Sequence, residues 1–153
     1  MTEASAGTSW PVPPGPLPGF DGLYGLRIET ISDTEVTARI AIRAHHLQPA
    51  GLVHGGVVAS MAESMASFAT HLAVSEEGMA AQGLSNHTSF LRPLGGATIH
   101  AVARRRHRGR STWVWEVDVS DDQGRLCALV RMTVAVRERP EAPTTSAPAQ
   151  PPR

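Results

Sequence analysis

The longest apolar segment of the chain spans residues 56–74. It consists mainly of Ala, Val, Met and Ser and contains no proline, so it predicts one long helix. Apolar positions lie all around this helix, a pattern typical of a helix buried on every side. Residues three or four positions apart share a helix face, and one such face differs from the rest because it is mostly small or polar. Its members are Gly56, Ser60, Glu63, Ser67 and Thr70 or His71.

Shorter segments on both sides of this helix predict β-strands. Before the helix, one strand is expected within residues 20–31 and a second over residues 36–42, where apolar and small or polar residues alternate. After the helix, four further segments predict strands: residues 79–91, 97–104, 112–119 and 126–136. We therefore expect an α+β fold in which an antiparallel sheet of about five to six strands wraps around one long central helix and buries it.

Length and composition predict one folded domain with flexible ends. The 153 residues suffice for a single core. Residues 1–18 are rich in Pro, Gly and Ser and predict a flexible arm, which Trp10 could dock. The domain is expected over residues 19–139, and the Pro-, Ala- and Thr-rich residues 140–153 predict a disordered tail.

Charge and cysteine content exclude several classes of protein. The 14 basic and 14 acidic residues cancel, which argues against nucleic acid as a partner. The one cysteine, Cys127, cannot form an intrachain disulfide and fits a reducing compartment. Glu63 and several serines interrupt the most apolar segment, and the first residues lack the basic and apolar regions of a secretory signal. We expect a cytoplasmic protein with no membrane span.

Motifs for other chemistry are missing from the sequence. No Cys or His residues show metal-ligand spacing, no P-loop lysine follows the glycines, and no Gly-x-Ser-x-Gly segment is present. We therefore expect no metal site, no nucleotide-hydrolysis site and no serine triad.

The start and the middle of the long helix hold the candidate chemistry. Gly55 and Gly56 leave backbone N–H groups open to a ligand, and the helix dipole there favours an oxyanion. Glu63, the only acidic side chain between His54 and Glu76, could act as a base or a nucleophile. The alternative is a core helix with an ion-paired glutamate and a glycine-rich turn.

The spacing of Gly55 and Glu63 has a consequence for assembly. The two residues lie eight positions apart, which is about 12 Å along a helix. That is too far for both to reach one carbonyl carbon. If both act on one substrate, a second copy of the helix must supply one of them, which predicts a dimer with shared sites.

Several blocks of the sequence resemble the hotdog-fold thioesterases. They are Gly51-Leu-Val-His-Gly-Gly56, Ser85-Asn-His-Thr-Ser-Phe90 with Arg92-Pro93, Thr112-Trp113 with Trp115, and Gly124-Arg-Leu-Cys-Ala128. The blocks are most similar to the Arthrobacter-type 4-hydroxybenzoyl-CoA thioesterase, and the resemblance covers roughly residues 20–139. It implies a hotdog fold, hydrolysis of an acyl-CoA, no cofactor beyond the coenzyme A of the substrate, and a homodimer or homotetramer.

The resemblance also implies catalytic roles for five residues. Glu63 matches the carboxylate that attacks the thioester or activates water, and Gly55 matches the glycine whose N–H polarises the thioester carbonyl. Gln48 matches a glutamine of the acyl site, and His54 a histidine that helps to hold it. Ser67 keeps a hydroxyl where the family has threonine, one helical turn after the carboxylate.

A second set of residues would bind the substrate. Arg92 matches an arginine used for the phosphates of coenzyme A. Ser111 and Thr112 align with a pair near the pantetheine and nucleotide path, and Arg110 replaces a serine before them. The arginine that the family carries near the C-terminal end is not at the matching position in this chain, and Arg139 is the nearby candidate.

Phe68 leaves the identity of the acyl group undecided, because it replaces an acidic residue of the family beside the active-site hydroxyl. The resemblance favours 4-hydroxybenzoyl-CoA, hydrolysed in aromatic degradation. The alternatives are a thioesterase for phenylacetyl- or medium-chain acyl-CoA, and a non-catalytic acyl-CoA-binding hotdog domain. Retention of Glu63 and of the Ser67 hydroxyl argues against the non-catalytic alternative.

Overall fold

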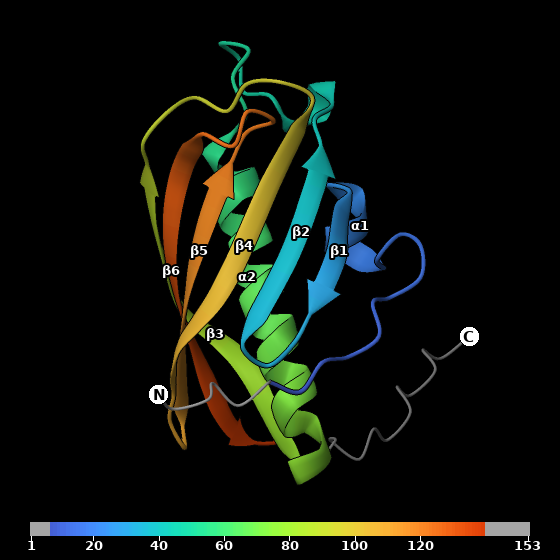
Figure 1. Ribbon diagram of the computed structural model, residues 1–153, viewed down its shortest axis with the longest axis vertical. Coiled ribbons are helices and arrows are strands. Elements are labelled where there is room, and N and C mark those ends of the chain that lie inside the picture. The colour runs from blue at the N-terminus through green and yellow to red at the C-terminus, as the bar shows by residue number, and fades with distance from the viewer. Residues whose placement is uncertain (1–6, 140–153) are drawn as a thin grey trace, which may run out of the picture.

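The computed structural model describes residues 7–139, so the expected tail over residues 140–153 and the first six residues of the arm lie outside the described residues. The elements in chain order are α1 (Gly19–Leu23), β1 (Leu26–Ile31), β2 (Glu35–Ala41), η1 (Ala44–His46), α2 (Gly55–Val74), η2 (Ser75–Glu77), β3 (Met79–Phe90), β4 (Thr98–Arg108), β5 (Thr112–Ser120) and β6 (Leu126–Glu138) (Figure 1).

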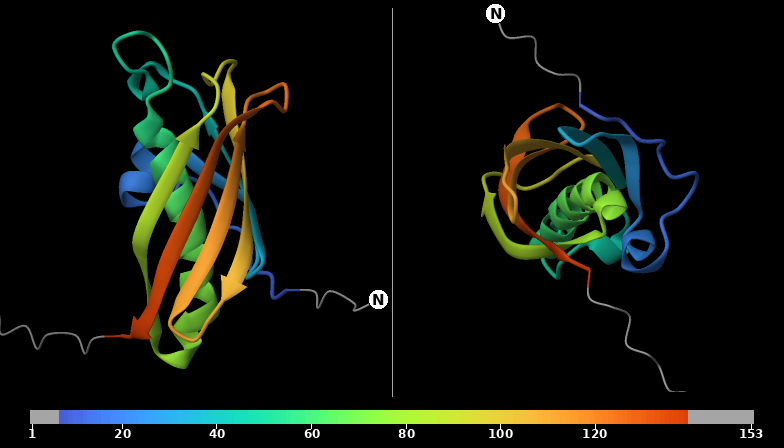
Figure 2. Two further views of the ribbon diagram at one scale, coloured as in Figure 1. Left: turned by 90° about the vertical axis from the view of Figure 1, so that its left-hand side faces the viewer. Right: turned by 90° about the horizontal axis from the view of Figure 1, so that it is seen from below.

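The six strands form one antiparallel sheet that curls around helix α2. The strand order is β1-β2-β4-β5-β6-β3. Seen along the helix axis, α2 lies inside the curve of the sheet (Figure 2). This arrangement confirms the predicted α+β fold with one central helix.

Alternation along the strands explains why the sheet holds the helix. In β5 the side chains of Trp113, Trp115 and Val117 are buried, while the residues between them are partly exposed. The indole Nε1–H of Trp115 donates a hydrogen bond to Thr70 Oγ1 of α2 at 3.0 Å. Thr70 therefore faces the sheet, and the polar stripe of the helix ends at His71 instead.

The prediction that α2 is buried on every side is wrong for the single chain. Its sheet-facing residues, such as Met61 and Met65, are fully buried, but Glu63 and His71 are exposed and Phe68 is only partly buried. The reason is that the sheet covers one side of the helix, and only the arm and α1 lie near the other side (Figure 2).

The structure fixes the bounds of two predicted strands. Strand β1 spans Leu26–Ile31, within the expected residues 20–31, and residues 19–23 before it form helix α1, which the pattern did not predict. Strand β4 extends to Arg108, beyond the expected end at residue 104.

The two edges of the sheet differ. At the β1 edge, Trp10 N–H donates to the Ile31 carbonyl at 3.0 Å, and Asp33 N–H donates to the Thr8 carbonyl at 2.9 Å. This part of the arm therefore covers the end of β1, and Trp10 packs on the core. At the other edge, β3 pairs only with β6 within residues 7–139. Most of its side chains are exposed.

Helix α2 with η2, Gly55–Glu77, is long and apolar enough to cross a membrane by length and composition alone. The expectation that no segment has this character is therefore wrong by that measure. The helix packs lengthwise against the sheet, however, and contacts β3 and β6 most extensively. The same apolar composition is what a core helix requires.

Candidate active site

Helix α2 begins at Gly55, and His54 caps it. The His54 Nδ1 accepts a hydrogen bond from Gly56 N–H at 2.8 Å, and the His54 carbonyl accepts one from Val57 N–H at 3.0 Å. Within residues 7–139, no acceptor pairs with Gly55 N–H. The free N–H therefore stands at the positive end of a 20-residue helix, where a developing oxyanion is stabilised.

A cavity of about 500 Å³ lies beside this N–H. Gln48, His54, Gly55 and Arg92 all line it, together with Phe90 at the end of β3. The structure thus brings together four residues that the sequence placed at the site. Gln48 Oε1 accepts a hydrogen bond from Ala50 N–H at 2.6 Å, which holds the Gln48 side chain against its own turn.

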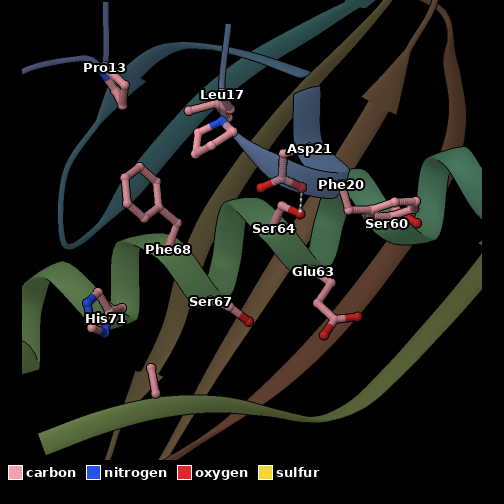
Figure 3. A pocket seen from close by; sticks show the side chains of 12 residues that line it. Pro13, Leu17, Phe20, Asp21, Ser60, Glu63, Ser64, Ser67, Phe68 and His71 are labelled. Carbon is pink, nitrogen blue, oxygen red and sulfur yellow. Dashed lines mark hydrogen bonds between the residues drawn. The ribbon is translucent and has the colours of Figure 1, made fainter. Parts of the chain in front are cut away.

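Glu63 and Ser67 line a second cavity, of about 670 Å³, on the same helix (Figure 3). Both side chains point from α2 toward β3, whereas Phe68 points toward the arm. The Ser67 Oγ is buried and has no hydrogen-bond partner in the described part of the chain. A buried hydroxyl without a hydrogen-bond partner costs folding free energy unless a ligand or a water molecule forms a hydrogen bond with it.

Gly83 of β3 lets the Glu63 carboxylate approach the strand. A Cβ added at Gly83 would lie 2.9 Å from Glu63 Oε1, so any larger residue would displace the carboxylate. Sequence reasoning missed this role, although a glycine inside a strand is a known sign of close approach.

The sequence also gave no sign of a polar cluster in the wall of the second cavity. Ser64 Oγ donates to Asp21 Oδ1 at 2.6 Å, Tyr24 OH donates to the same oxygen at 2.8 Å, and the two hydroxyl oxygens lie 2.9 Å apart. Burial raises the pKa of Tyr24 far above its usual range, and the negative charges of Asp21 and Glu63 act in the same direction. Tyr24 is therefore a neutral donor at any physiological pH.

The expected coenzyme A residues do not come together within one chain. Arg92 N–H donates to the Cys127 carbonyl at one end of β6. Thr112 pairs with Ala135, and Arg139 N–H donates to the Gly78 carbonyl near the other end. The eight strand positions from residue 127 to residue 135 correspond to about 26 Å. Ser111 and Arg110 lie beside Thr112, so they are equally distant from Arg92.

Residues 104–110 form a basic run, Arg-Arg-Arg-His-Arg-Gly-Arg, and most of its arginines are engaged in ion pairs. Arg104 pairs with Glu35 and Asp118, and Arg106 pairs with Glu116. Arg105 and Arg108 both lie near the buried Asp33 carboxylate, and their guanidinium groups sit over the ring of Trp113. In the described part of the chain, Arg110 forms no ion pair, so it is the member of the run left available for a phosphate.

Sequence comparison identifies the family. A sequence model described as the thioesterase superfamily matches residues 50–128. The chain belongs to this superfamily. The match begins before helix α2 and ends inside β6, so it includes both the free Gly55 N–H and the Glu63 carboxylate.

Individual members of the superfamily agree with this assignment. The 1,4-dihydroxy-2-naphthoyl-CoA hydrolase of Escherichia coli is 31% identical over 115 residues, which cover 75% of this chain and 84% of that protein. The proofreading thioesterase EntH of Klebsiella pneumoniae is 35% identical over 99 residues, 65% of this chain and 72% of that protein. A crystal structure of a mutant thioesterase from Pseudomonas aeruginosa is 37% identical, with a TM-score of 0.71 over 74% of this chain and 82% of that one. The hotdog fold expected from the sequence is thereby confirmed.

Proposed function

We propose that this thioesterase-superfamily protein hydrolyses an acyl-CoA to the free acid and coenzyme A. The observation that carries the proposal is the free Gly55 N–H at the start of α2, followed on the same helix by Glu63 and the unpartnered Ser67 hydroxyl. An N–H of this kind stabilises the oxyanion of a tetrahedral intermediate by a few kcal/mol.

Glu63 and Ser67, which line the second cavity, supply the remaining chemistry. Ser67 Oγ can hold a water molecule beside Glu63, whose carboxylate removes a proton as the water oxygen attacks the thioester carbon. Collapse of the intermediate breaks the C–S bond, and the proton passes from Glu63 to the departing thiolate. In the alternative route the carboxylate itself attacks and forms an anhydride, which water then hydrolyses.

One chain cannot complete this site, because Gly55 and Glu63 lie about 12 Å apart along one helix. The exposed edge of β3 supports a dimer that solves the problem, since an unpaired strand edge is a ready site for pairing with a second copy. A two-fold axis through the middle of β3 would run the two helices in opposite directions. Gly55 of one copy would then approach Glu63 of the other.

The same two-fold axis would assemble the coenzyme A site. This axis places the end of one copy's sheet, where Arg92 lies, beside the opposite end of the other copy's sheet. That opposite end holds Arg110, Ser111, Thr112 and Arg139. We therefore propose that the coenzyme A moiety is bound between copies, and that such dimers pair into a tetramer.

The acyl group enters the cavity that Phe68 lines together with Leu17 and Phe20. We propose an aromatic acyl group, with 4-hydroxybenzoyl-CoA as the favoured substrate, in a cytoplasmic enzyme of aromatic degradation. A relative named for hydrolysis of a dihydroxynaphthoyl-CoA supports an aromatic substrate. Phenylacetyl- or medium-chain acyl-CoA is the alternative for this cavity.

The test is thiol release from a panel of acyl-CoAs, with wild type and Glu63→Ala measured side by side. Turnover of 4-hydroxybenzoyl-CoA that the variant loses would support the proposal in full. Turnover of another acyl-CoA, again lost in the variant, would retain the mechanism and change the substrate. A folded oligomer that binds acyl-CoA without hydrolysing any of them would instead support the non-catalytic binding domain.

A further inference from the structure

Strands β1 and β2 place three arginines on one outer face of the sheet. Arg27 and Arg39 lie directly opposite each other in the β1–β2 register, between positions whose side chains are buried. The backbone remains extended past the end of β2 at Arg43, so residues 39, 41 and 43 share this face. The small side chain of Ala41 leaves the space between the two arginines of this segment open.

The positive charge on this face is only partly balanced. Arg39 pairs with Glu29 at 2.9 Å. In the described part of the chain, Arg27 forms no ion pair, and the Arg43 guanidinium donates only to the carbonyl of Ile42, at 3.0 Å. Like charges directly opposite each other destabilise a sheet. A sequence that retains such a pair at a cost in stability indicates a function for the charge.

A pocket of about 330 Å³ lies among these side chains. The three arginines line it together with the exposed imidazole of His45 and with residues 22–25 at the end of α1. It shares no lining residue with the two cavities of the candidate active site. We propose that this pocket binds a small diphosphate-bearing anion. The inference goes beyond the proposed hydrolysis and does not depend on it.

The lining of the pocket favours a charged ligand over an apolar one. A guanidinium group binds phosphate oxygens through two parallel N–H donors. Arg27 comes from β1 and Arg43 follows β2, so an anion with two phosphate groups can bridge them. Among the lining residues only Tyr24 carries a benzene ring, and it is buried, so no such ring is open to stack on a nucleobase. A small anion therefore fits this pocket better than an acyl chain or a nucleoside.

Hydrogen bonds connect the pocket to the loop that leads into α2. Arg43 N–H donates to His46 Nδ1 at 2.9 Å, and His54 N–H donates to the His46 carbonyl at 2.8 Å. The loop between these two histidines carries Gln48, and His54 caps the helix. An anion that holds Arg43 should therefore also restrict this loop. Amide hydrogen exchange over residues 47–54 should then be slower in the bound state.

The test of the site is calorimetric titration of the full chain with pyrophosphate, for wild type, Arg27→Gln, Arg43→Gln and the control Arg131→Gln. Arg131 is also an exposed arginine of the outer face, paired with Glu116, but β6 lies three strands away from β2. Loss of one charged donor should weaken pyrophosphate binding by about tenfold or more in each pocket variant. The control should bind as wild type does. Equal weakening in all three variants, or no binding to wild type, would overturn the site.

Thermal unfolding gives an independent readout. Pyrophosphate should raise the Tm of wild type and of Arg131→Gln, because a ligand that binds only the folded state stabilises it. The Tm of Arg27→Gln should not respond. Without the anion, Arg27→Gln should unfold at or above the wild-type temperature, since the repulsion from Arg39 is gone. A clear drop in its Tm would contradict the argument from charge.

Competition separates two sources of the diphosphate. Coenzyme A that displaces pyrophosphate, with an affinity about tenfold lower in Arg43→Gln, would identify the diphosphate of coenzyme A. Pyrophosphate binding that saturating coenzyme A leaves unchanged would identify a free diphosphate. Both results retain the site, and neither requires hydrolysis. Hydrogen exchange in the loop that pyrophosphate fails to slow in wild type would overturn the coupling to α2.

Discussion

The ring of Phe90, at the end of β3, lies directly against Gly55 in the first turn of α2. A Cβ added at Gly55 would come within 2.6 Å of the ring Cζ. The same ring is 60% exposed and lines the cavity beside the free N–H. Glycine is therefore required at this position by a neighbour from a distant strand as well as by access to the N–H.

Gly55→Ala should lower kcat/KM for the best acyl-CoA by about 100-fold, because the methyl group displaces Phe90 and shifts the oxyanion donor. In the Phe90→Ala background the same substitution should cost much less, since the clash is gone. Steady-state kinetics of the four proteins measure this coupling.

Gly95→Ala is the matched control for this cycle. An added Cβ there meets nothing within 4 Å, so activity should stay at the wild-type level. An equal loss for Gly55→Ala with and without the Phe90 ring would contradict the steric explanation.

Mixed dimers test the shared site. Glu63→Ala and Gly55→Val should each abolish hydrolysis. After co-refolding, a mixed dimer would contain one site with both native residues, so about a quarter of wild-type activity should return in a statistical mixture. Mass spectrometry of the mixture verifies that mixed dimers are present. If they are present and activity stays absent, each site lies within one chain.

His54 should be important for stability through its helix cap. Removing the side-chain acceptor in His54→Ala leaves Gly56 N–H unpaired and should cost about 1 kcal/mol of unfolding free energy. Asparagine is a strong N-cap residue, so His54→Asn should recover most of this loss. Urea unfolding of the three proteins is the measurement. Equal destabilisation by Ala and Asn would show that the cap is not the source of the effect.

His46 predicts a pH-dependent stability. Its side chain is buried, Nδ1 accepts from Arg43 N–H at 2.9 Å, and Nε2 lies 3.1 Å from the Tyr24 carbonyl. Burial lowers the pKa of His46 below its usual value, and the charges of His45 and Arg43 act in the same direction. The unfolded chain therefore binds a proton at a higher pH than the folded one does.

The sign of this effect follows from proton linkage. The contribution of His46 is complete above the unfolded pKa of about 6.5 and is lost as the pH falls below it toward the folded value, by up to about 1.4 kcal/mol per pH unit. Urea unfolding at pH 7.5 and 5.5 should show a steeper loss for wild type than for His46→Gln. Parallel losses in the two proteins would exclude His46 as the titrating group.

The sequence by itself determined the long helix α2, the six strands and the catalytic candidates Gly55 and Glu63, but not the short helix α1. The apolar run of residues 56–74 defined α2 to within one residue of its start at Gly55. Alternation identified the strands, because burial of one face imposes a period of two. Gly55 and Glu63 could be selected because a helix start and a lone carboxylate in an apolar segment are local features.

Only the tertiary structure decided which distant residues share a site. Asp21 and Ser64 lie 43 positions apart, and the approaches of Phe90 to Gly55 and of Gly83 to Glu63 depend on the register of β3. The exposure of Glu63 depends on which side of α2 the sheet leaves uncovered. Local periodicity specifies the face that a residue occupies, but the partner that the face meets is set by strand order and packing across the whole chain.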